Sequence, residues 1–329
     1  MPAPLRFLNR PRILVTRRLP ATVEAAISAR YDVTLNGDDL PMSPAAIREA
    51  FSQFDILCPT ITDPLDADVI GSLTDVRAQM IANFGAGVNH IDLDAATQRN
   101  ILVTNTPGAL TDATADLTLM LILMLARRAS EGERELRAGN WAGWRPTHML
   151  GTDLRGKTLG LFGYGRIAKA VAERVSPLGM HVLYYRRSAP ADTSEDGLAT
   201  RVDTLDALLT RSDIVSLHAP GTATTHHVID ATVLARMKPG ALLINTARGT
   251  LVDEAALADA LRTGTIAGAA LDVYEHEPAV HPDLLVSDKV VLMPHLGSAT
   301  LQTREAMGMR MLANVDAFCG GMTPRDIVQ

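Results

Sequence analysis

Residues 158–175 read TLGLFGYGRIAKAVAERV, and this stretch decides the fold. Its first part, Thr158–Phe162, is a short apolar run with the length of a buried strand. A Gly-x-Gly-x-x-Ala turn occupies 163–168, and apolar residues then recur at helical spacing. A second apolar run, His181–Tyr185, follows the helical segment. The stretch therefore predicts a strand, a tight turn, a helix and a second, parallel strand.

The turn has the pattern of a dinucleotide-binding site. Gly163 permits the tight turn, and Gly165 lets the backbone approach a pyrophosphate. Ala168 takes the place of the glycine that allows close packing of helix on strand, a replacement that the pattern tolerates. Because the helix begins at this turn, its free amide groups would point at the phosphates.

The residues after the second strand indicate which dinucleotide binds. A site for NAD(H) places Asp or Glu there, where the carboxylate holds the ribose hydroxyls. This chain has Arg186, Arg187 and Ser188 instead, and two guanidinium groups attract a 2′-phosphate. The alternative is a pair of solvated arginines on a surface turn. We expect NADP(H) as the cofactor, with NAD(H) used at lower efficiency.

Short apolar runs alternate with helical patterns along the whole chain, which is typical of an α/β fold with parallel sheets. The other candidate strands are Arg12–Val15, Phe54–Cys58, Arg77–Ala82, Ile101–Thr104, Asp213–Leu217, Ala241–Ile244, Ala267–Leu271 and Val290–Met293. One helix is predicted over Asp253–Thr263, since Asp253 can cap its start and Gly264 can end it.

Glycine, proline and tryptophan crowd together in Gly132–Gly156, so we expect an arm or long loop there rather than a helix. Trp141 and Trp144 are the two tryptophans of the chain. They either pack locally under the loop or anchor an interface between chains, where Trp is enriched.

The composition narrows the class of protein. A length of 329 residues suggests two domains, and 47% hydrophobic with 21% charged residues is ordinary for a globular chain. The net charge of −6 argues against nucleic acid as a partner. Two cysteines suit a reducing compartment, and the longest apolar stretch, Leu117–Ala126, is too short to cross a bilayer. We expect a cytoplasmic protein with no membrane partner.

Three segments with functional groups each follow a candidate strand directly. They are Asn245–Thr250, Asp272–Pro278 and Pro294–Ser298. Ligands of open parallel sheets bind beyond the carboxyl ends of the strands, so the three segments can converge on one crevice.

The groups in these segments suit the reduction of a 2-keto acid. The guanidinium of Arg248 can grip a carboxylate through two hydrogen bonds. The imidazole of His295 can donate a proton to the carbonyl oxygen, because imidazoles titrate near neutral pH. Glu277 can favour the charged ring and fix which nitrogen faces the substrate.

We assign no metal site. Glu275, His276, Glu277 and His281 match no helical His–Glu metal motif. His226 and His227 are adjacent, so their side chains should diverge in any regular element, and we expect them at the surface.

Several motifs in combination resemble the D-isomer-specific 2-hydroxyacid dehydrogenase family over nearly the full length, most of all its glyoxylate/hydroxypyruvate reductase branch. They are 83–92 (NFGAGVNHID), 105–108 (NTPG), 114–116 (TAD), the dinucleotide turn and the three segments above.

The resemblance implies a role for each matching residue. The catalytic triad would be Arg248, Glu277 and His295. The substrate carboxylate would bind the backbone amides of Ala86 and Gly87 together with Arg248. The cofactor would contact Arg166 and Ile167 at the pyrophosphate, Thr246 and Ala247 near the nicotinamide ribose, and Asp272 at the carboxamide.

The resemblance also implies the architecture. We expect two doubly wound parallel-sheet domains of Rossmann or flavodoxin type, with the active site in the cleft between them. The substrate domain would be discontinuous, 1–106 with 300–329, and 107–299 would form the dinucleotide-binding domain. A homodimer is implied as well, with the tryptophan arm reaching toward the partner.

The expected reaction is transfer of a hydride from NADPH to glyoxylate or hydroxypyruvate, giving the D-2-hydroxy acid. One alternative is a bulkier keto acid of the phenylpyruvate type, or 2-ketogluconate. An alternative of a different class is a nucleotide-sensing regulatory protein of the co-repressor type, which would keep the same motifs without turnover.

Overall fold

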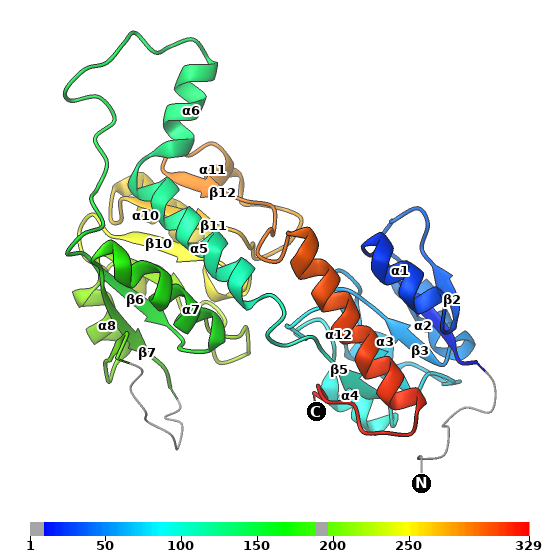
Figure 1. Ribbon diagram of the computed structural model, residues 1–329. Helices are drawn as coiled ribbons and strands as arrows, with labels where there is room; N and C mark the ends of the chain where they lie inside the picture. The colour runs from blue at the N-terminus through cyan, green and yellow to red at the C-terminus, as the bar shows by residue number, and fades with distance from the viewer. Residues whose placement is uncertain (1–9, 188–196, 329) are drawn as a thin grey trace. The chain divides into compact units, whose positions relative to one another are not determined.

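The computed structural model describes residues 10–187 and 197–328. The chain forms two compact units, Met1–Leu110 with Ala299–Gln329, and Thr111–Ser298. Each unit contains one parallel sheet with helices on both faces, so the predicted α/β fold with two doubly wound sheets is confirmed. Figure 1 shows the last helix, α12, beside the helices and strands of the amino-terminal segment.

The first unit carries a five-stranded sheet in the order β2-β1-β3-β4-β5. Its strands are β1 (Arg12–Val15), β2 (Asp32–Leu35), β3 (Ile56–Cys58), β4 (Met80–Ala82) and β5 (Leu102–Thr104). Helices α1 (Ala21–Ser28) and α12 (Leu301–Cys319) cover one face, and α2 (Pro44–Gln53), α3 (Ala67–Gly71) and α4 (Leu93–Gln98) cover the other. Successive strand residues point to opposite faces, so Ile13 packs under the first pair of helices and Leu14 under the second group.

The second unit carries a seven-stranded sheet in the order β12-β11-β10-β9-β6-β7-β8. Its strands are β6 (Thr158–Phe162), β7 (His181–Tyr185), β8 (Thr200–Arg201), β9 (Ile214–Leu217), β10 (Leu242–Asn245), β11 (Gly268–Leu271) and β12 (Val290–Leu292). Helices α5 (Thr111–Ala126) and α7 (Arg166–Val175) cover one face. The other face is covered by α8 (Leu205–Arg211), α9 (Ala231–Leu234), α10 (Glu254–Thr263) and α11 (Pro282–Leu285).

The strand order of the second unit reverses between β6 and β9, because the chain builds one half of the sheet outward from β6 and the other half from β9. In open parallel sheets this reversal point is where ligands bind, beyond the carboxyl ends of the strands. The predicted strand–turn–helix–strand unit, β6–α7–β7, lies at this point.

The predicted helix over Asp253–Thr263 is confirmed at both ends. Asp253 caps α10 by accepting a hydrogen bond from the amide of Ala256, and Gly264 ends it in a left-handed conformation with φ 78°. Both devices act through local geometry, so the sequence sufficed to place them.

One prediction of local structure in the second unit was wrong, and two strands of the fold were not predicted. Helix α6 (Ala129–Arg137) occupies the start of the segment that was predicted to be non-helical. Ion pairs between Arg128 and Glu131 and between Glu133 and Arg137 support this helix from its own surface and offset the cost of its glycine. Strands β2 and β8 were not predicted, because β2 is a mostly exposed edge strand and β8 has two residues.

In the described ranges, 10–187 and 197–328, no helix combines the length and the apolar character needed to cross a bilayer.

Candidate active site

In the glycine turn after β6, close packing requires the first glycine, and the second glycine faces open space. Gly163 has φ 94°, and a Cβ there would lie 2.8 Å from backbone atoms of His218 and Ala219, which follow β9. Gly165 is the N-cap of α7, and nothing lies within 4 Å of the position that its Cβ would take. The turn therefore leaves an open path to the amino terminus of a ten-residue helix, where backbone amides favour phosphate.

Arg166 and Ile167 are the first two residues of α7, so their amide groups lie in the helical turn that has no internal acceptors. Ala168 is fully buried in the core between α7 and the sheet. The replacement of the third glycine by alanine is thus accommodated by packing.

Arg186 lies beside the glycine turn. It follows Tyr185, whose carbonyl accepts the Gly163 amide at 2.8 Å, because β6 and β7 are neighbours. The guanidinium lies 6.0 Å from the ring centroid of Tyr184, which stacks on Tyr164 at 3.9 Å. The Nε atom of Arg186 is buried and hydrogen-bonds to no described residue.

Arg187 and Ser188 are the other two residues that were predicted to distinguish NADP(H) from NAD(H). Arg187 is exposed, and Ser188 lies outside the described residues.

The turn after β10 is held by one buried side chain that sequence reasoning missed. The Asn245 side chain accepts a hydrogen bond from the Ala247 amide at 3.0 Å and donates to the Arg248 carbonyl at 2.8 Å. Thr246 is buried, with its hydroxyl 2.9 Å from that of Thr118 in α5. Asn245 ends a predicted strand and precedes the predicted site, which was the available signal.

Arg248 is half-buried, and its Nη1 donates to the carbonyl of Ala247 at 2.6 Å. Burial lowers the pKa of its guanidinium, and the nearby carboxylate of Glu277 works in the opposite direction. An arginine stays charged under both influences, so the group remains a carboxylate binder.

Asp272 positions the loop that carries His295. Its carboxylate oxygens accept the amides of Leu296 at 2.6 Å and Gly297 at 2.8 Å, and its carbonyl accepts the amide of His295 at 2.9 Å. Burial raises the pKa of Asp272, although these two amide bonds act to lower it. Each oxygen can accept a second bond, so the role predicted at the nicotinamide carboxamide stays a prediction.

His295 and Glu277 form a pair. Nδ1 of His295 lies 2.8 Å from Oε2 of Glu277, whose Oε1 accepts the amide of Tyr274 at 3.0 Å. Burial acts to raise the pKa of Glu277, but the hydrogen bond and charge of His295, with help from Arg248, lower it overall. His295 has φ 54°, a conformation that non-glycine residues rarely adopt and that is frequent at functional sites.

The strands that precede the three predicted segments end at one edge of the sheet. Asn245 pairs in register with Leu271, and Leu271 pairs with Leu292, so β10, β11 and β12 end side by side. Glu277 is thereby brought within reach of the charges of both Arg248 and His295.

Ala86 and Gly87 belong to the first unit, in the loop after β4. The Asn83 side chain donates to the carbonyls of Gly85 at 3.1 Å and Gly87 at 3.0 Å, and Asn105 donates to that of Ala86 at 2.7 Å. With these carbonyls engaged, the amides of Ala86 and Gly87 form no hydrogen bond with any described residue. Such adjacent free amides suit an anion.

The prediction that the side chains of His226 and His227 diverge was wrong. Their rings stack, with centroids 4.0 Å apart. They lie in a turn rather than a regular element, and His227 has φ 48°, which swings its side chain back toward that of its neighbour.

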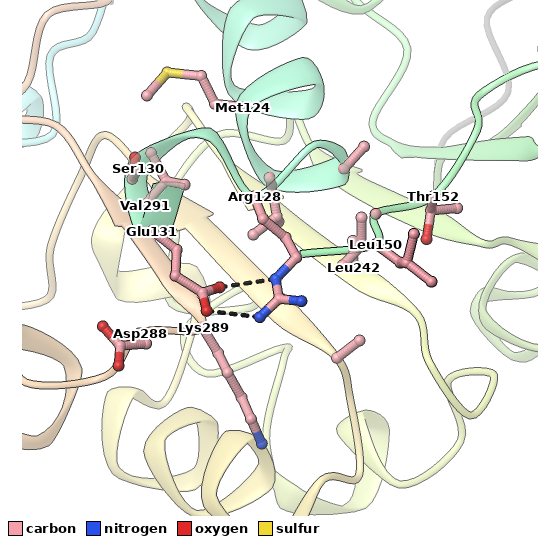
Figure 2. A pocket seen from close by; sticks show the side chains of 14 residues that line it. Met124, Arg128, Ser130, Glu131, Leu150, Thr152, Leu242, Asp288, Lys289 and Val291 are labelled. Atoms are coloured by element: carbon pink, nitrogen blue, oxygen red, sulfur yellow. Dashed lines mark hydrogen bonds and ion pairs between the residues drawn. The ribbon is translucent and has the colours of Figure 1, made fainter. Parts of the chain in front are cut away.

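A cavity of about 270 Å³ lies at the opposite ends of β10 and β12, below the junction of α5 and α6 (Figure 2). Among its wall residues are Leu242, Leu150 and Met124, and Arg128 closes one side through two hydrogen bonds to Glu131. Leu242 begins β10, whereas Arg248 lies beyond its other end, so this cavity is separate from the candidate site.

Comparisons with known proteins agree with this geometry. Residues 119–297 match the model of the NAD-binding domain of D-isomer-specific 2-hydroxyacid dehydrogenases. The chain is 41% identical to the glyoxylate reductase of Thermococcus litoralis, covering 97% of both chains.

Two solved structures are similar over almost their whole length. A putative D-isomer-specific 2-hydroxyacid dehydrogenase from Polaromonas has a TM-score of 0.89 and 35% identity, covering 98% of this chain and 100% of its own. An NADPH-dependent glyoxylate/hydroxypyruvate reductase from Sinorhizobium meliloti, solved with NADP and malonate, has a TM-score of 0.86 and 34% identity, covering 97% of both chains. The chain therefore belongs to the D-isomer-specific 2-hydroxyacid dehydrogenase family, in its glyoxylate reductase branch.

Proposed function

We propose that the protein is an NADPH-dependent reductase of small 2-keto acids, with glyoxylate and hydroxypyruvate as substrates and the D-2-hydroxy acid as product. The observation that carries the proposal is the pairing of His295 with Glu277 beside Arg248. It supplies a proton donor and a carboxylate binder at the edge of a nicotinamide dinucleotide domain.

The residues present fit the cofactor. Gly163 and Gly165 leave the phosphate path open, and Arg186 directly follows the end of β7. The reduced nicotinamide supplies the hydride when the cofactor is bound. Because Arg186 and Arg187 replace the acidic residue of an NAD(H) site, they favour the 2′-phosphate of NADPH.

The protein's own groups would handle the carboxylate and the proton. The guanidinium of Arg248 and the free amides of Ala86 and Gly87 hold the substrate carboxylate. Nδ1 of His295 is occupied by Glu277, which leaves Nε2 to donate a proton to the carbonyl oxygen. The lowered pKa of Glu277 keeps it ionised at neutral pH, where it orients the ring.

The two units of the chain would have different roles in the reaction. We assign the substrate-domain role to 1–106 with 300–329, and the dinucleotide-binding role to 107–299.

We also propose a homodimer in which α6 and the arm that follows it, up to Gly156, contact the partner chain. No residue of α6 is buried, and Trp141, Trp144 and Leu150 are 51%, 82% and 66% exposed. Trp144 is thus not packed under its own loop, which leaves the interface alternative. Light scattering should give twice the mass of the 35.3 kDa chain, and a monomeric mass would contradict the dimer.

The reaction is tested by assaying a panel of about a dozen keto acids, from glyoxylate to phenylpyruvate and 2-ketogluconate, with NADPH and with NADH. We expect the highest kcat/KM for glyoxylate or hydroxypyruvate with NADPH. A preference for a bulky acid would replace the substrate, a preference for NADH would overturn the cofactor, and no turnover with any acid would favour a nucleotide-sensing role.

The cofactor proposal is tested separately with Arg186→Ser. A hydrogen bond to a charged group contributes about 1.5–3 kcal/mol, so kcat/KM for NADPH should fall roughly 10- to 100-fold. Activity with NADH should change little, and an equal loss with both cofactors would contradict a role at the 2′-phosphate.

A further inference from the structure

A cluster of metal-ligating side chains lies beside the loop that follows β11. One ligand atom each from His226, His227 and Glu275 lies within 4.8 Å of the others, and Nε2 of His227 is 2.6 Å from Oε1 of Glu275. The sequence predicted no metal site, because the two histidines lie far from Glu275 along the chain. Since the fold brings them together, we propose that these three side chains bind a divalent transition-metal ion, with Zn²⁺ as its representative. The site is distinct from the proposed catalytic triad, and the dehydrogenase reaction does not require it.

The backbone brings the three side chains together without help from a metal. The amide of His226 donates to the Thr222 carbonyl at 3.0 Å, and the amide of His227 donates to the Thr250 carbonyl at 2.9 Å. On the other side, the amide of Glu275 donates to Oε1 of Glu254 at 2.8 Å. Both segments are thus anchored, so little conformational entropy is lost when an ion binds.

A close backbone approach fixes the distance between these segments. A Cβ on Gly249 would lie 1.9 Å from the carbonyl carbon of Tyr274, so only glycine allows the turn after β10 to meet the loop after β11. Since His227 bonds to Thr250 on one segment and Glu275 lies on the other, the cluster spans this junction.

The donor set selects the kind of ion. Two imidazole nitrogens and one carboxylate oxygen are ligands that Zn²⁺ and its neighbours accept, and three protein ligands leave a fourth position open. His276 can reach that position, because its side chain is 83% exposed and its Nε2 lies 3.9 Å from Oε1 of Glu275. Mg²⁺ prefers oxygen ligands in an octahedron, so it should not compete.

An ion bound here would tie together two segments that carry proposed catalytic residues. Thr250 is two residues from Arg248, and Glu275 is two residues from Glu277. Metal binding should therefore stabilise the second unit against unfolding. Its three ligands are positioned outside the triad, so the readout is binding and stability rather than turnover.

The experiment uses the untagged full-length protein after treatment with EDTA and dialysis. Titration with ZnCl₂ in a calorimeter should show one site per chain, and saturating ZnCl₂ should raise Tm by roughly 5 °C, because a ligand that binds only the folded state stabilises it. MgCl₂ should produce neither effect.

Variants identify the ligands. His226→Ala, His227→Asn and Glu275→Gln should each weaken Zn²⁺ binding at least about tenfold, because each removes one of three protein ligands. Asn tolerates the left-handed conformation of residue 227, and His226 is exposed, so neither change should prevent folding. His181→Ala, at the exposed start of β7, is the matched control and should bind like the wild type.

Absence of binding at about 100 μM ZnCl₂, a concentration that would detect even a weak site, would overturn the proposal. Unchanged affinity in all three ligand variants would also overturn it, as would equal losses in these variants and in His181→Ala. Calorimetry reports binding directly, so these outcomes do not depend on whether the protein reduces keto acids.

Discussion

Two histidine–glutamate pairs meet the loop that follows β11, and they differ in what surrounds them. Nδ1 of His295 lies 2.8 Å from Oε2 of Glu277, and Nε2 of His227 lies 2.6 Å from Oε1 of Glu275. Both histidines have positive φ, 54° and 48°, so in each pair a strained turn directs the ring toward the loop. The local chemistry of the two pairs is nearly the same.

The two histidine–glutamate pairs differ in their neighbouring residues. Glu277 lies within the electrostatic influence of Arg248, and its pairing through Nδ1 leaves Nε2 of His295 for another group. His227 instead stacks on His226, so its pair gains a second imidazole where the other pair has a guanidinium. A guanidinium favours a bound carboxylate, whereas a second imidazole favours a metal ion. The third residue therefore decides what such a pair can do.

The largest expected effect comes from His295→Asn, which keeps a residue that tolerates positive φ and removes the proposed proton donor. We expect kcat with glyoxylate and NADPH to fall about 10²–10⁴-fold, the usual contribution of general acid catalysis. The Kd for NADPH, measured by fluorescence titration, should stay near the wild-type value. A kcat within about threefold of wild type would contradict the assignment of His295 as acid.

Glu277→Gln should have a smaller effect, because the proposed acid, His295, remains but loses the carboxylate that holds its ring. We expect kcat to fall about 10- to 100-fold, less than for the loss of the acid itself. Steady-state assays of both variants side by side would test this order. If Glu277→Gln were the more damaging change, the carboxylate would have to act on the substrate directly.

Glu277 should also make the stability of the folded protein depend on pH. Because the pKa of Glu277 is lowered in the folded protein, its stabilising contribution is fully present above the ordinary carboxyl pKa of about 4.3. The contribution disappears as the pH falls through the lower folded-state pKa. The difference in unfolding free energy between wild type and Glu277→Gln, from urea titrations, should therefore shrink from pH 7 to about pH 3.5. A difference that stays constant over this pH range would contradict a stabilising role of the ionised Glu277 side chain.

The smallest effect on turnover is expected from His227→Asn, the same substitution in the other pair. We expect kcat to stay within about twofold of wild type, because the His227 side chain bonds to Glu275 and not to a residue of the proposed triad. The pair of Asn variants thus separates the two regions: one loses turnover and keeps Zn²⁺ binding, and the other does the reverse. Equal losses of kcat in both variants would show that the two pairs act as one site.

Much of the fold and of the candidate site could be predicted from local sequence patterns. The glycine turn, the caps of α10 and the strands that precede Arg248 and His295 depend on short-range geometry, which adjacent residues specify. The order of the candidate triad along the chain could be assigned by resemblance for the same reason.

Other features depend on residues that are distant in sequence. Asp272 holds the loop of His295 from 24 and 25 residues away. This role has no local signature, because the partner amides become neighbours of Asp272 only when β11 and β12 align. Asn245 differs, since its side chain bonds to residues two and three positions further on, and Asn forms such turns locally. Strand β2, mostly exposed at a sheet edge, was missed because no buried run marks it.

The sequence by itself determined the α/β class, the place of the dinucleotide turn and the choice of arginines over an acidic residue after β7, since each is set by residues close along the chain. Only the tertiary structure decided that His227 turns toward Glu275 and His295 toward Glu277. Two turns with positive φ and one close approach at Gly249 set these pairings. Such contacts are set by how separate strands end at a common sheet edge, and no local pattern encodes that alignment.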